Sequence, residues 1–557
     1  MSSNGKPSLF SPASQSASAK KDPAAKIDSK TDPKAEPKAA APTDVPSVSS
    51  SAKPSAEVIP GAAPAAAANA TSAQTSSKLV TLKNDVLSLS IDSLGGQIKR
   101  SELLTHKDTE KKDLNFVLLT EEPGKVYLAQ SGLTGPEGNA FPNHRTLMQV
   151  KDESQAAIAA TGVATDKAST SFVVESGGIK LTRTYSLSRG SYVLDVKDEI
   201  SNIGTSPVAP ALYMQLARDT HKLPGESQFY STYTGPAIYT EQGKFQKVDF
   251  GDIEKKKAEY VKSAMDGWAG IIQHYFVAAW IPADKTNREF YTNKIEDRAL
   301  YTVGMKQPIK ELAPGDSTTL ETRLYVGPQD QQAMAKVAPG LDLTVDYGWL
   351  TAVAKPIFAL MQYLHGLVGN WGWAIVLLTI VIKTIFFPLQ AASYKSMARM
   401  KAVTPKMTSL RERFKDDRVK LNQGMMELYK TEKINPLGGC LPVVVQIPVF
   451  IALYWVLLAS VEMRNAPWIL WIKDLAAPDP WYILPLLMAG TMFIHRRLNP
   501  TPPDPIQARM MQIMPIVFSV MFFFFPAGLV LYWLVNNMYS IAQQWYITKR
   551  IEAGVKK

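Results

Sequence analysis

Hydrophobic and polar residues follow different patterns in the two halves of this chain of 557 residues. Between Leu79 and Val326, apolar residues alternate with polar ones over many short stretches. In VLSLSID, for example, Leu87, Leu89 and Ile91 face one way and the residues between them face the other. Alternation with a period of two, interrupted by turn residues, is typical of antiparallel strands that bury one face. The pattern therefore predicts a β-sandwich domain at residues 79–340.

Long apolar stretches dominate the chain from Trp349 onward. Five of them are candidate membrane spans: Trp371–Ala391, Leu437–Val461, Trp481–His495, Met510–Phe525 and Gly528–Ile547. The third and fourth would form only about 23–24 Å of helix against a hydrocarbon core of ~30 Å. The sequence predicts an α-helical five-span bundle at residues 371–550, with a bilayer that thins around the short spans unless these extend by a turn.

Residues 341–370, just before the first span, have apolar positions at helical spacing that include Leu350, Val353, Ile357 and Leu360. Polar residues lie between them, which is typical of a helix on a membrane surface. We predict an interfacial amphipathic helix here. A buried helix of the β-domain is the alternative that the pattern leaves open.

Residues 392–436 are polar but also have a helical pattern, in which Met397, Met400, Val403 and Met407 recur every three or four residues. The pattern predicts a hairpin of two amphipathic helices with a methionine-rich face suited to adaptable contacts. The basic residues expected to dock partners are Arg399, Lys406, Arg411, Arg413 and Lys415. A plain solvated hairpin fits the same pattern.

Basic residues also set the expected orientation. They are frequent in segment 392–436, whereas the segment Glu462–Pro480 has only Arg464 and Lys473. Because positively charged loops stay in the cytoplasm, we expect the hairpin and the short basic tail at 551–557 on that side, and the β-domain outside. This topology explains the net charge of +11 better than nucleic-acid binding does.

The first 78 residues are mostly Ala, Ser, Pro, Lys, Asp and Thr. Such a segment cannot bury enough apolar surface to offset its chain entropy, so residues 1–78 are predicted to form a disordered tether. An exported β-domain needs a signal or a span upstream, yet the start MSSNGKPSLF is hydrophilic. We therefore expect that a signal anchor is missing from this chain. The single cysteine, Cys440, excludes an intrachain disulfide.

The sequence contains no GxSxG, HExxH or phosphate-binding glycine motif. The histidines His106, His144, His221 and His274 lie too far apart to propose a metal site from spacing. We therefore expect no enzymatic activity, no cofactor and no metal. Carbohydrate or peptide binding by the β-domain stays open, although no residue pattern points to it.

One charge interrupts the apolar stretch WAIVLLTIVIKTIFFPLQ, at Lys383. A lysine near mid-depth of a span costs about 2.5–3.5 kcal/mol on insertion scales, and such residues are usually functional. The Cα–Cβ bond tilts toward the helix N-terminus, which works against snorkelling to the cytoplasmic headgroups. We predict a hydrated groove formed by Lys383 with Thr379, Gln446, Ser519, Tyr532, Trp533, Asn536 and Asn537. Snorkelling and scattered, satisfied polar residues are the alternative.

Three segments closely resemble the YidC membrane protein insertase family of bacterial inner membranes, in its Gram-negative type with a large periplasmic domain. They are KINPLGGCLPVVVQIPVFIALYWVLLASVEMRNAPWILWIKDLAAPDPWYILP (Lys433 to Pro485), FPAGLVLYWLVNN (Phe525 to Asn537) and IKTIFFPL around Lys383. The resemblance covers nearly all of Trp349–Lys549 and is looser in the β-domain.

The resemblance implies an insertase and chaperone that inserts and folds inner-membrane proteins, alone or with the Sec translocon, through a polar groove open to the cytoplasm and to lipid. The β-domain would be a periplasmic β-supersandwich. The implied partners are nascent membrane-protein clients, the Sec translocon, the ribosome and the lipid bilayer. Lys383 takes the place of a groove residue that is usually arginine in the family, which keeps the charge but loses the planar fork of donors.

A small-solute transporter or channel is the alternative function. It predicts internal repeats or broken helices with paired charges, whereas this sequence shows no repeat and one clear intramembrane charge. An intramembrane protease would need a Ser/His or paired-Asp arrangement within the spans. The candidates Ser460, Ser519, Ser540 and His495 form no pair at helical spacing.

Overall fold

The structure is a computed structural model that describes residues 77–136, 140–155, 166–222, 232–295, 299–415, 417–432, 441–498 and 505–555. The predictions of a disordered tether at 1–78 and of a missing signal anchor fall on the chain before residue 77, outside the described residues. The beginning of the second predicted span, 433–440, and the last two residues of the predicted tail also lie outside them.

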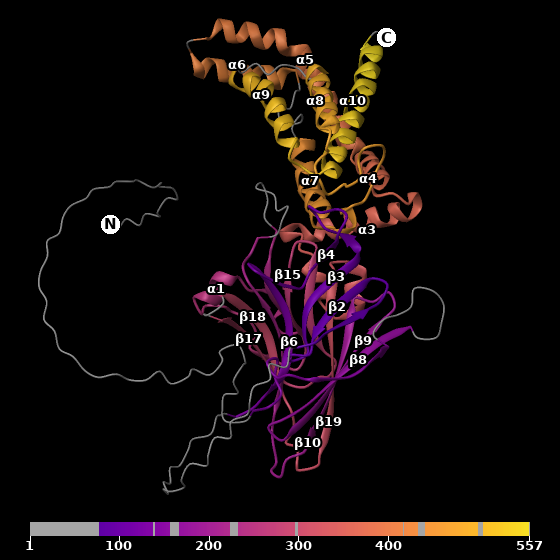
Figure 1. The fold of residues 1–557 in the computed structure, drawn as a ribbon. Helices are drawn as coiled ribbons and strands as arrows, with labels where there is room; N and C mark the ends of the chain where they lie inside the picture. The colour runs from indigo at the N-terminus through magenta and orange to yellow at the C-terminus, as the bar shows by residue number, and fades with distance from the viewer. Residues whose placement is uncertain are drawn as a thin grey trace, which may run out of the picture. The chain divides into compact units, whose positions relative to one another are not determined.

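The first half of the described chain forms two antiparallel β-sheets (Figure 1). One has ten strands: β1 Leu79–Lys83, β2 Leu87–Asp92, β3 Gln97–Lys107, β4 Asn115–Val117, β5 Thr120–Glu122, β6 Lys125–Thr134, β11 Ala211–Arg218, β14 Ser263–Ala264, β17 Arg288–Ile295 and β18 Leu300–Pro308. The other has nine: β7 Gln149–Gln155, β8 Lys167–Ser176, β9 Ile179–Ser188, β10 Val193–Asn202, β12 Gly235–Thr240, β13 Lys244–Lys247, β15 Trp268–Ile272, β16 Phe276–Pro282 and β19 Ser317–Pro328.

Strand order mixes neighbours in sequence with distant partners. The first sheet runs β1-β2-β3-β6-β11-β18-β17-β14, with β4 beside β3 and β5 beside β6. The second runs β13-β12-β15-β16-β19-β10-β9-β8-β7. In the second sheet β19 lies between β16 and β10, where Val193 pairs with Tyr325 across more than a hundred residues of chain.

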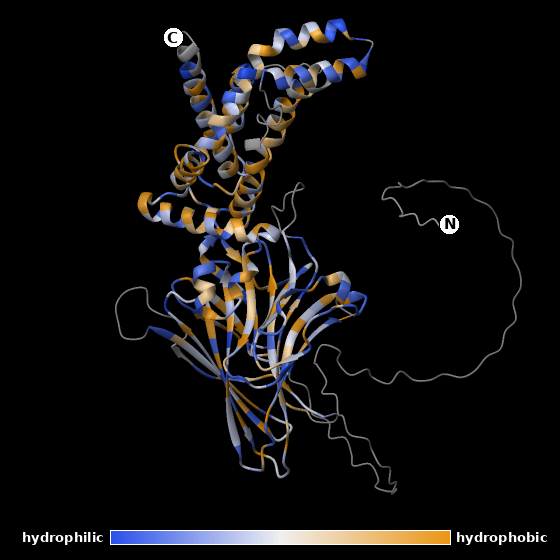
Figure 2. Ribbon diagram, turned by 180° about the vertical axis from the view of Figure 1, so that it is seen from behind, coloured by the Kyte–Doolittle hydropathy of each residue, from blue (hydrophilic) through white to orange (hydrophobic). Residues whose placement is uncertain are grey.

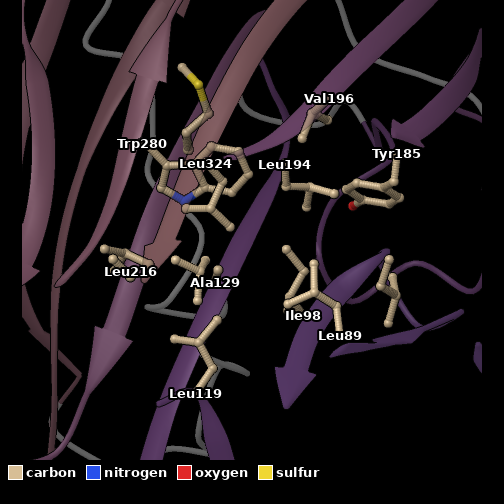
Figure 3. Packing of buried hydrophobic residues seen from close by; sticks show 14 of the residues in the cluster. Leu89, Ile98, Leu119, Ala129, Tyr185, Leu194, Val196, Leu216, Trp280 and Leu324 are labelled. Atoms are coloured by element: carbon tan, nitrogen blue, oxygen red, sulfur yellow. The ribbon is translucent and has the colours of Figure 1, made fainter. Parts of the chain in front are cut away.

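The two sheets bury a common hydrophobic core, as the close-up in Figure 3 shows. Leu89, Ile98 and Leu216 come from the first sheet, and Leu194 and Trp280 from the second. Along β9 and β10, buried and less buried residues alternate, because successive side chains of a strand point to opposite faces. The predicted antiparallel β-sandwich is confirmed.

A buried ion pair joins the neighbouring strands β9 and β10 of the second sheet. Arg183 and Asp198 are directly paired in the register and are 0% and 1% exposed. Arg183 donates from Nε to Asp198 Oδ1 at 2.6 Å and from Nη2 to Oδ2 at 3.1 Å, and its Nη1 donates to Ser131 O at 3.3 Å. Two parallel charge-assisted bonds are the arrangement that lets an ion pair exist without water.

One short helix, α1 Phe250–Glu254, lies within the β-domain between β13 and β14. The rest of the described chain is mainly helical, as predicted. Its helices are α2 Gln331–Val337, η2 Leu341–Thr344, η3 Gly348–Leu350, α3 Thr351–Val368, α4 Trp371–Ile385, α5 Phe387–Arg413, α6 Arg418–Thr431, α7 Leu441–Ala459, η5 Val461–Met463, α8 Ile483–Leu498, α9 Pro505–Phe522 and α10 Ala527–Val555. Figure 2 shows hydrophobic residues along most of α3 to α10, with more hydrophilic ones on α5 and α6 and at the end of α10.

None of the described helices is by itself both long enough and apolar enough to cross a bilayer. The pair formed by α4 and residues Phe387–Met397 of α5 passes that test together, and these two helices are bent by 64° where they meet.

The segment before α4 is a helix with one buried face. Its buried residues are Ala354, Phe358, Met361 and Leu364, and this face packs against α4 and α7. Tyr363 and Leu367, at 66% and 65% exposure, lie on the other face. Gly369 ends α3 with a left-handed backbone (φ 65°), and the Asn370 side chain then caps α4 by accepting from Trp373 N.

α5 and α6 form a helical hairpin (Figure 1). Val403 and Met407 of α5 are buried against Met425 and Leu428 of α6, and Lys406 Nζ lies 2.6 Å from Glu432 Oε1. The methionine-rich face of the hairpin is thus its internal packing face in this structure.

Candidate functional site

A cavity of about 390 Å³ lies among α4, α5, α7, α8 and α10. Its lining residues are Lys383 from α4; Gln390, Ser393, Tyr394 and Met397 from α5; Gln446, Ile447 and Phe450 from α7; Met492 and His495 from α8; and Tyr532, Trp533, Asn536, Asn537 and Ser540 from α10. Polar groups from all five helices thus face apolar and aromatic side chains across one space. Such a lining suits a polypeptide segment with both polar and apolar parts.

Lys383 meets its hydrogen-bond partner because its helix ends within one turn. Pro388 has no backbone N–H and cannot continue α4, so the chain bends at Phe386 and α5 leaves at 64°. The bend brings Gln390 back toward Lys383, whose Nζ donates to Gln390 Oε1 at 3.3 Å. Lys383 is 2% exposed. A positive charge is therefore held inside the helical bundle with a carboxamide oxygen as its acceptor.

Three carboxamides continue from this ammonium in series. Gln390 Nε2 donates to Gln446 Oε1 at 3.2 Å, and Gln446 Nε2 donates to Asn536 Oδ1 at 2.8 Å. An ammonium group can only donate, so the carboxamide oxygen of Gln390 must face it and the Gln390 NH2 group points to the next residue. In the same way, each carboxamide that accepts through its oxygen donates through its NH2 group to the next carboxamide. Four helices, α4, α5, α7 and α10, are linked by this chain of hydrogen bonds, which we call the carboxamide chain.

The electrostatic character of the cavity is positive. Lys383 and His495 are its basic residues, and none of the lining residues that the structure describes is acidic. On the aromatic side, the Phe450 and Trp533 rings lie 4.6 Å apart, and Tyr532 is 1% exposed. The arrangement can therefore hold an anionic or polar group at Lys383 and an apolar side chain against the aromatic rings.

Six of the eight residues predicted for the groove line this cavity: Lys383, Gln446, Tyr532, Trp533, Asn536 and Asn537. Thr379 and Ser519 are not among the lining residues. Each hydroxyl donates to a carbonyl of its own helix, Thr379 Oγ1 to Ile375 O at 2.7 Å and Ser519 Oγ to Pro515 O at 2.6 Å.

The most informative residue that the sequence reasoning missed is Gln390. It follows Lys383 by seven positions, and on a straight helix it would lie about 10.5 Å further along the axis. Pro388 is the signal that could have pointed to it, because a proline there ends the first helix and redirects the chain. Ser393, Tyr394 and Met397 were missed for the same reason, since they belong to α5 and not to an extended first span.

The basic residues predicted for docking lie on the α5–α6 hairpin or its turn. Arg399, Lys406, Arg413 and Lys415 are exposed, and Arg411 is half-buried. Lys406 already pairs with Glu432. Within the described ranges, no group of three His, Cys, Asp or Glu residues is placed to hold a metal ion.

Comparisons with known proteins cover both halves of the chain. The family described as YidC periplasmic domain matches residues 79–360, and the family described as 60Kd inner membrane protein matches residues 363–554. A curated relative named membrane protein insertase YidC, from Bordetella parapertussis, is 56% identical over 477 residues, which are 86% of this chain and 84% of the relative. Its namesake from Burkholderia vietnamiensis is 54% identical over 485 residues, which are 86% and 85% of the two chains.

A solved structure titled "Active YidC insertase crystal structure with the first transmembrane domain resolved" also matches, at 17% identity and a TM-score of 0.39, over 85% of this chain and 93% of that one. The level of identity to the curated relatives and the span of the two family matches decide the assignment. This chain belongs to the YidC family of membrane protein insertases, which are proteins of the bacterial inner membrane.

Proposed function

We propose that this insertase passes its clients through the cavity around Lys383, acting as a polar groove that is open to the cytoplasm and to lipid. The observation that carries the proposal is the buried ammonium group of Lys383 at the head of the carboxamide chain. A polar group taken from water into hydrocarbon loses its hydrogen bonds, and donors placed at that depth replace them. The groove residues would be Lys383, Gln446, Tyr532, Trp533 and Asn536, with Thr379 of α4 and Ser519 of α9 in supporting positions.

Insertion in this scheme needs no covalent chemistry, cofactor or metal. A client's short hydrophilic segment enters the groove, where Lys383 lowers the cost of its acidic residues. The client's apolar helix then moves into lipid, and the burial of ~20 apolar residues supplies the driving force. The membrane potential adds about 2.3 kcal/mol per charge per 100 mV for acidic residues that move outward.

The proposed topology has five membrane spans between residues 371 and 550, the β-domain of residues 79–340 in the periplasm, and the hairpin of residues 392–436 and the C-terminus in the cytoplasm. The asymmetry of basic residues between the loops supports this orientation. Residues 341–370 would lie along the periplasmic surface of the inner membrane, and the exposed Tyr363 and Leu367 suit that position. α8 has 16 residues, about 24 Å of helix, so the bilayer would thin near it.

Nascent membrane proteins and the lipid bilayer are the partners that an insertase requires. We also propose that the hairpin meets the ribosome and the Sec translocon through Arg399, Lys406, Arg411, Arg413 and Lys415. The exposure of four of these five residues supports a docking surface.

The test is depletion of the native insertase and complementation with Lys383→Ala and Lys383→Arg, scored by insertion of a small single-span client that has acidic residues in its translocated segment. The alanine variant should lose most of the insertion, because the groove then lacks its fixed charge. The arginine variant should keep it if a positive field is sufficient. Lys395→Ala, an exposed lysine of α5, is the matched control. Full insertion by the alanine variant at normal protein level would remove Lys383 from the mechanism.

A further inference from the structure

The segment between α7 and α8 contains a second hollow, of about 540 Å³, lined by Leu470, Trp471, Lys473 and Trp481. It is separate from the groove, since the two share no lining residue. In the proposed topology this segment lies at the periplasmic surface of the inner membrane, at the opposite ends of α7 and α8 from the hairpin.

The segment has a fixed structure of its own. Ile472 and Leu475 are 2% and 1% exposed and anchor it in the helical core. The Asp479 carboxylate, 1% exposed, accepts from Trp471 Nε1 at 2.9 Å, from Trp481 N at 3.0 Å and from Leu484 N at 2.7 Å. One buried carboxylate therefore fixes both tryptophans, whose rings stack at 5.6 Å between centroids with 12° between their planes.

This fixed segment presents large apolar side chains outward. Leu470 is 72% exposed and Trp481 is 64% exposed. Leu470 and Tyr482 also have left-handed backbones, with φ of 53° and 58°, a conformation that is unfavourable for residues with a side chain. Exposure of such large apolar side chains to water is unfavourable, whereas the boundary between lipid headgroups and acyl chains favours tryptophan and leucine together.

Lys473 adds a positive charge at the rim. It is exposed, and the contacts described for this part of the chain give it no ion pair. The two carboxylates nearest in sequence are occupied by backbone groups: Asp474 accepts from Asn465 N and Ala476 N, and Asp479 holds the bonds given above. The Lys473 ammonium is therefore available to an anion from the membrane surface.

We propose that this hollow binds one phospholipid of the outer leaflet, with its phosphate at Lys473 Nζ and the beginning of an acyl chain on Leu470 and the stacked Trp471–Trp481 pair. The inference rests on the proposed function in one respect, the placement of this segment at the membrane surface. Continuity supports lipid as the occupant, because α8 leads away from the hollow with Leu486 and Leu487, at 60% and 52% exposure, facing outward.

The test is native mass spectrometry of the purified, delipidated full chain titrated with dioleoylphosphatidylglycerol or with dioleoylglycerol, which has the same chains but no phosphate. The chain should bind one phosphatidylglycerol more tightly than dioleoylglycerol. Lys473→Gln should weaken phosphatidylglycerol binding about fivefold, the effect of one lysine at an anionic surface. Lys310→Gln, an exposed lysine of the β-domain, is the charge-matched control and should leave binding unchanged. Trp481→Ala should weaken the binding of both lipids.

Equal binding by Lys473→Gln and the unchanged chain would overturn the proposal, as would equal binding of the two lipids. Hydrogen exchange on the same samples gives a second readout, since phosphatidylglycerol should slow exchange at residues 468–484 in the unchanged chain. No client takes part in these measurements. A failure here is therefore distinct from a failure of the Lys383 variants in client insertion.

Discussion

Replacing Gln446 by glutamate would place a negative charge within the carboxamide chain. A glutamate at this position can still accept from Gln390 Nε2, as Gln446 does at 3.2 Å, but it can no longer donate to Asn536 Oδ1. The side chain keeps almost the same shape, so the main change is electrostatic. The net charge that Lys383 gives to the cavity would be cancelled.

The size of this effect follows from the hydrogen-bond geometry. Lys383 and residue 446 are joined through one carboxamide by hydrogen bonds of 3.3 and 3.2 Å, which places the two charges roughly 5–9 Å apart. At an effective dielectric constant of ~20, opposite charges at that distance attract by about 2–3 kcal/mol. The cavity is not enclosed, so hydration reduces this value by about half, to about 1–1.5 kcal/mol. A client carboxylate that loses this attraction should insert about five to ten times more slowly.

The assay is insertion into proteoliposomes of two single-span clients that differ only in the translocated segment, one with acidic residues and one with neutral residues. Gln446→Glu should slow insertion of the acidic client by this factor and affect the neutral client much less. Gln446→Leu is the matched control, because it also removes the donation to Asn536 Oδ1, together with the hydrogen bond from Gln390, without adding a charge. It should affect both clients equally.

Equal slowing of the two clients by Gln446→Glu would refute the electrostatic reasoning. The carboxamide chain would then be a structural element of the bundle and not part of the groove. Unchanged insertion of the acidic client, with the variant folded and present at normal level, would refute it as well.

Two predictions concern the β-domain and are read by calorimetry of the full chain in detergent. Asp198→Asn leaves the buried Arg183 cation without its counter-charge, so the free energy of unfolding of the domain should fall by about 3–5 kcal/mol and its unfolding temperature by roughly 10 °C. Glu199→Gln, on the exposed face of the same strand, is the control and should change the unfolding temperature little. An unchanged unfolding temperature in Asp198→Asn would contradict this prediction. Burial lowers the pKa of His274 from 6.5 to about 4. Between these two pH values the imidazole is protonated in the unfolded chain but neutral in the folded chain. The free energy of unfolding should therefore be highest above about pH 6.5 and decrease as the pH drops toward about 4. His274→Gln should flatten part of that slope, and an identical slope in the variant would exclude this histidine as its source.

The alternation of apolar and polar residues was sufficient to predict the β-domain, but not its strand order. β9 alternates buried and less buried residues throughout, so its strand character can be read locally. β11 and β16 are buried along their whole length and have no alternation. The insertion of β19 between β16 and β10 depends on contacts across more than a hundred residues, which leave no local pattern.

For the groove, the sequence identified the charge but not its acceptor. Lys383 was conspicuous because a charge in an apolar stretch is costly, and the polar residues of α7 and α10 were conspicuous for the same reason. Thr379 shares a helical face with Lys383, yet its hydroxyl bonds to its own helix, as buried threonines commonly do. Gln390 depends on the bend at Phe386, and the predicted span ran straight through that bend to Ala391.

The carboxamide chain explains how one lysine can influence a space wider than its own reach. Because the Lys383 ammonium only donates, the oxygen of Gln390 must face it, and the amide dipoles of Gln390, Gln446 and Asn536 are then aligned in one direction. Aligned dipoles strengthen one another in a medium of low dielectric constant. Their positive ends point away from Lys383, so the N–H groups of Asn536 on α10 extend the positive character across the cavity. An acidic client segment would thus meet donors on α10 as well as on α4, and a negative charge at position 446 would interrupt that alignment at its middle.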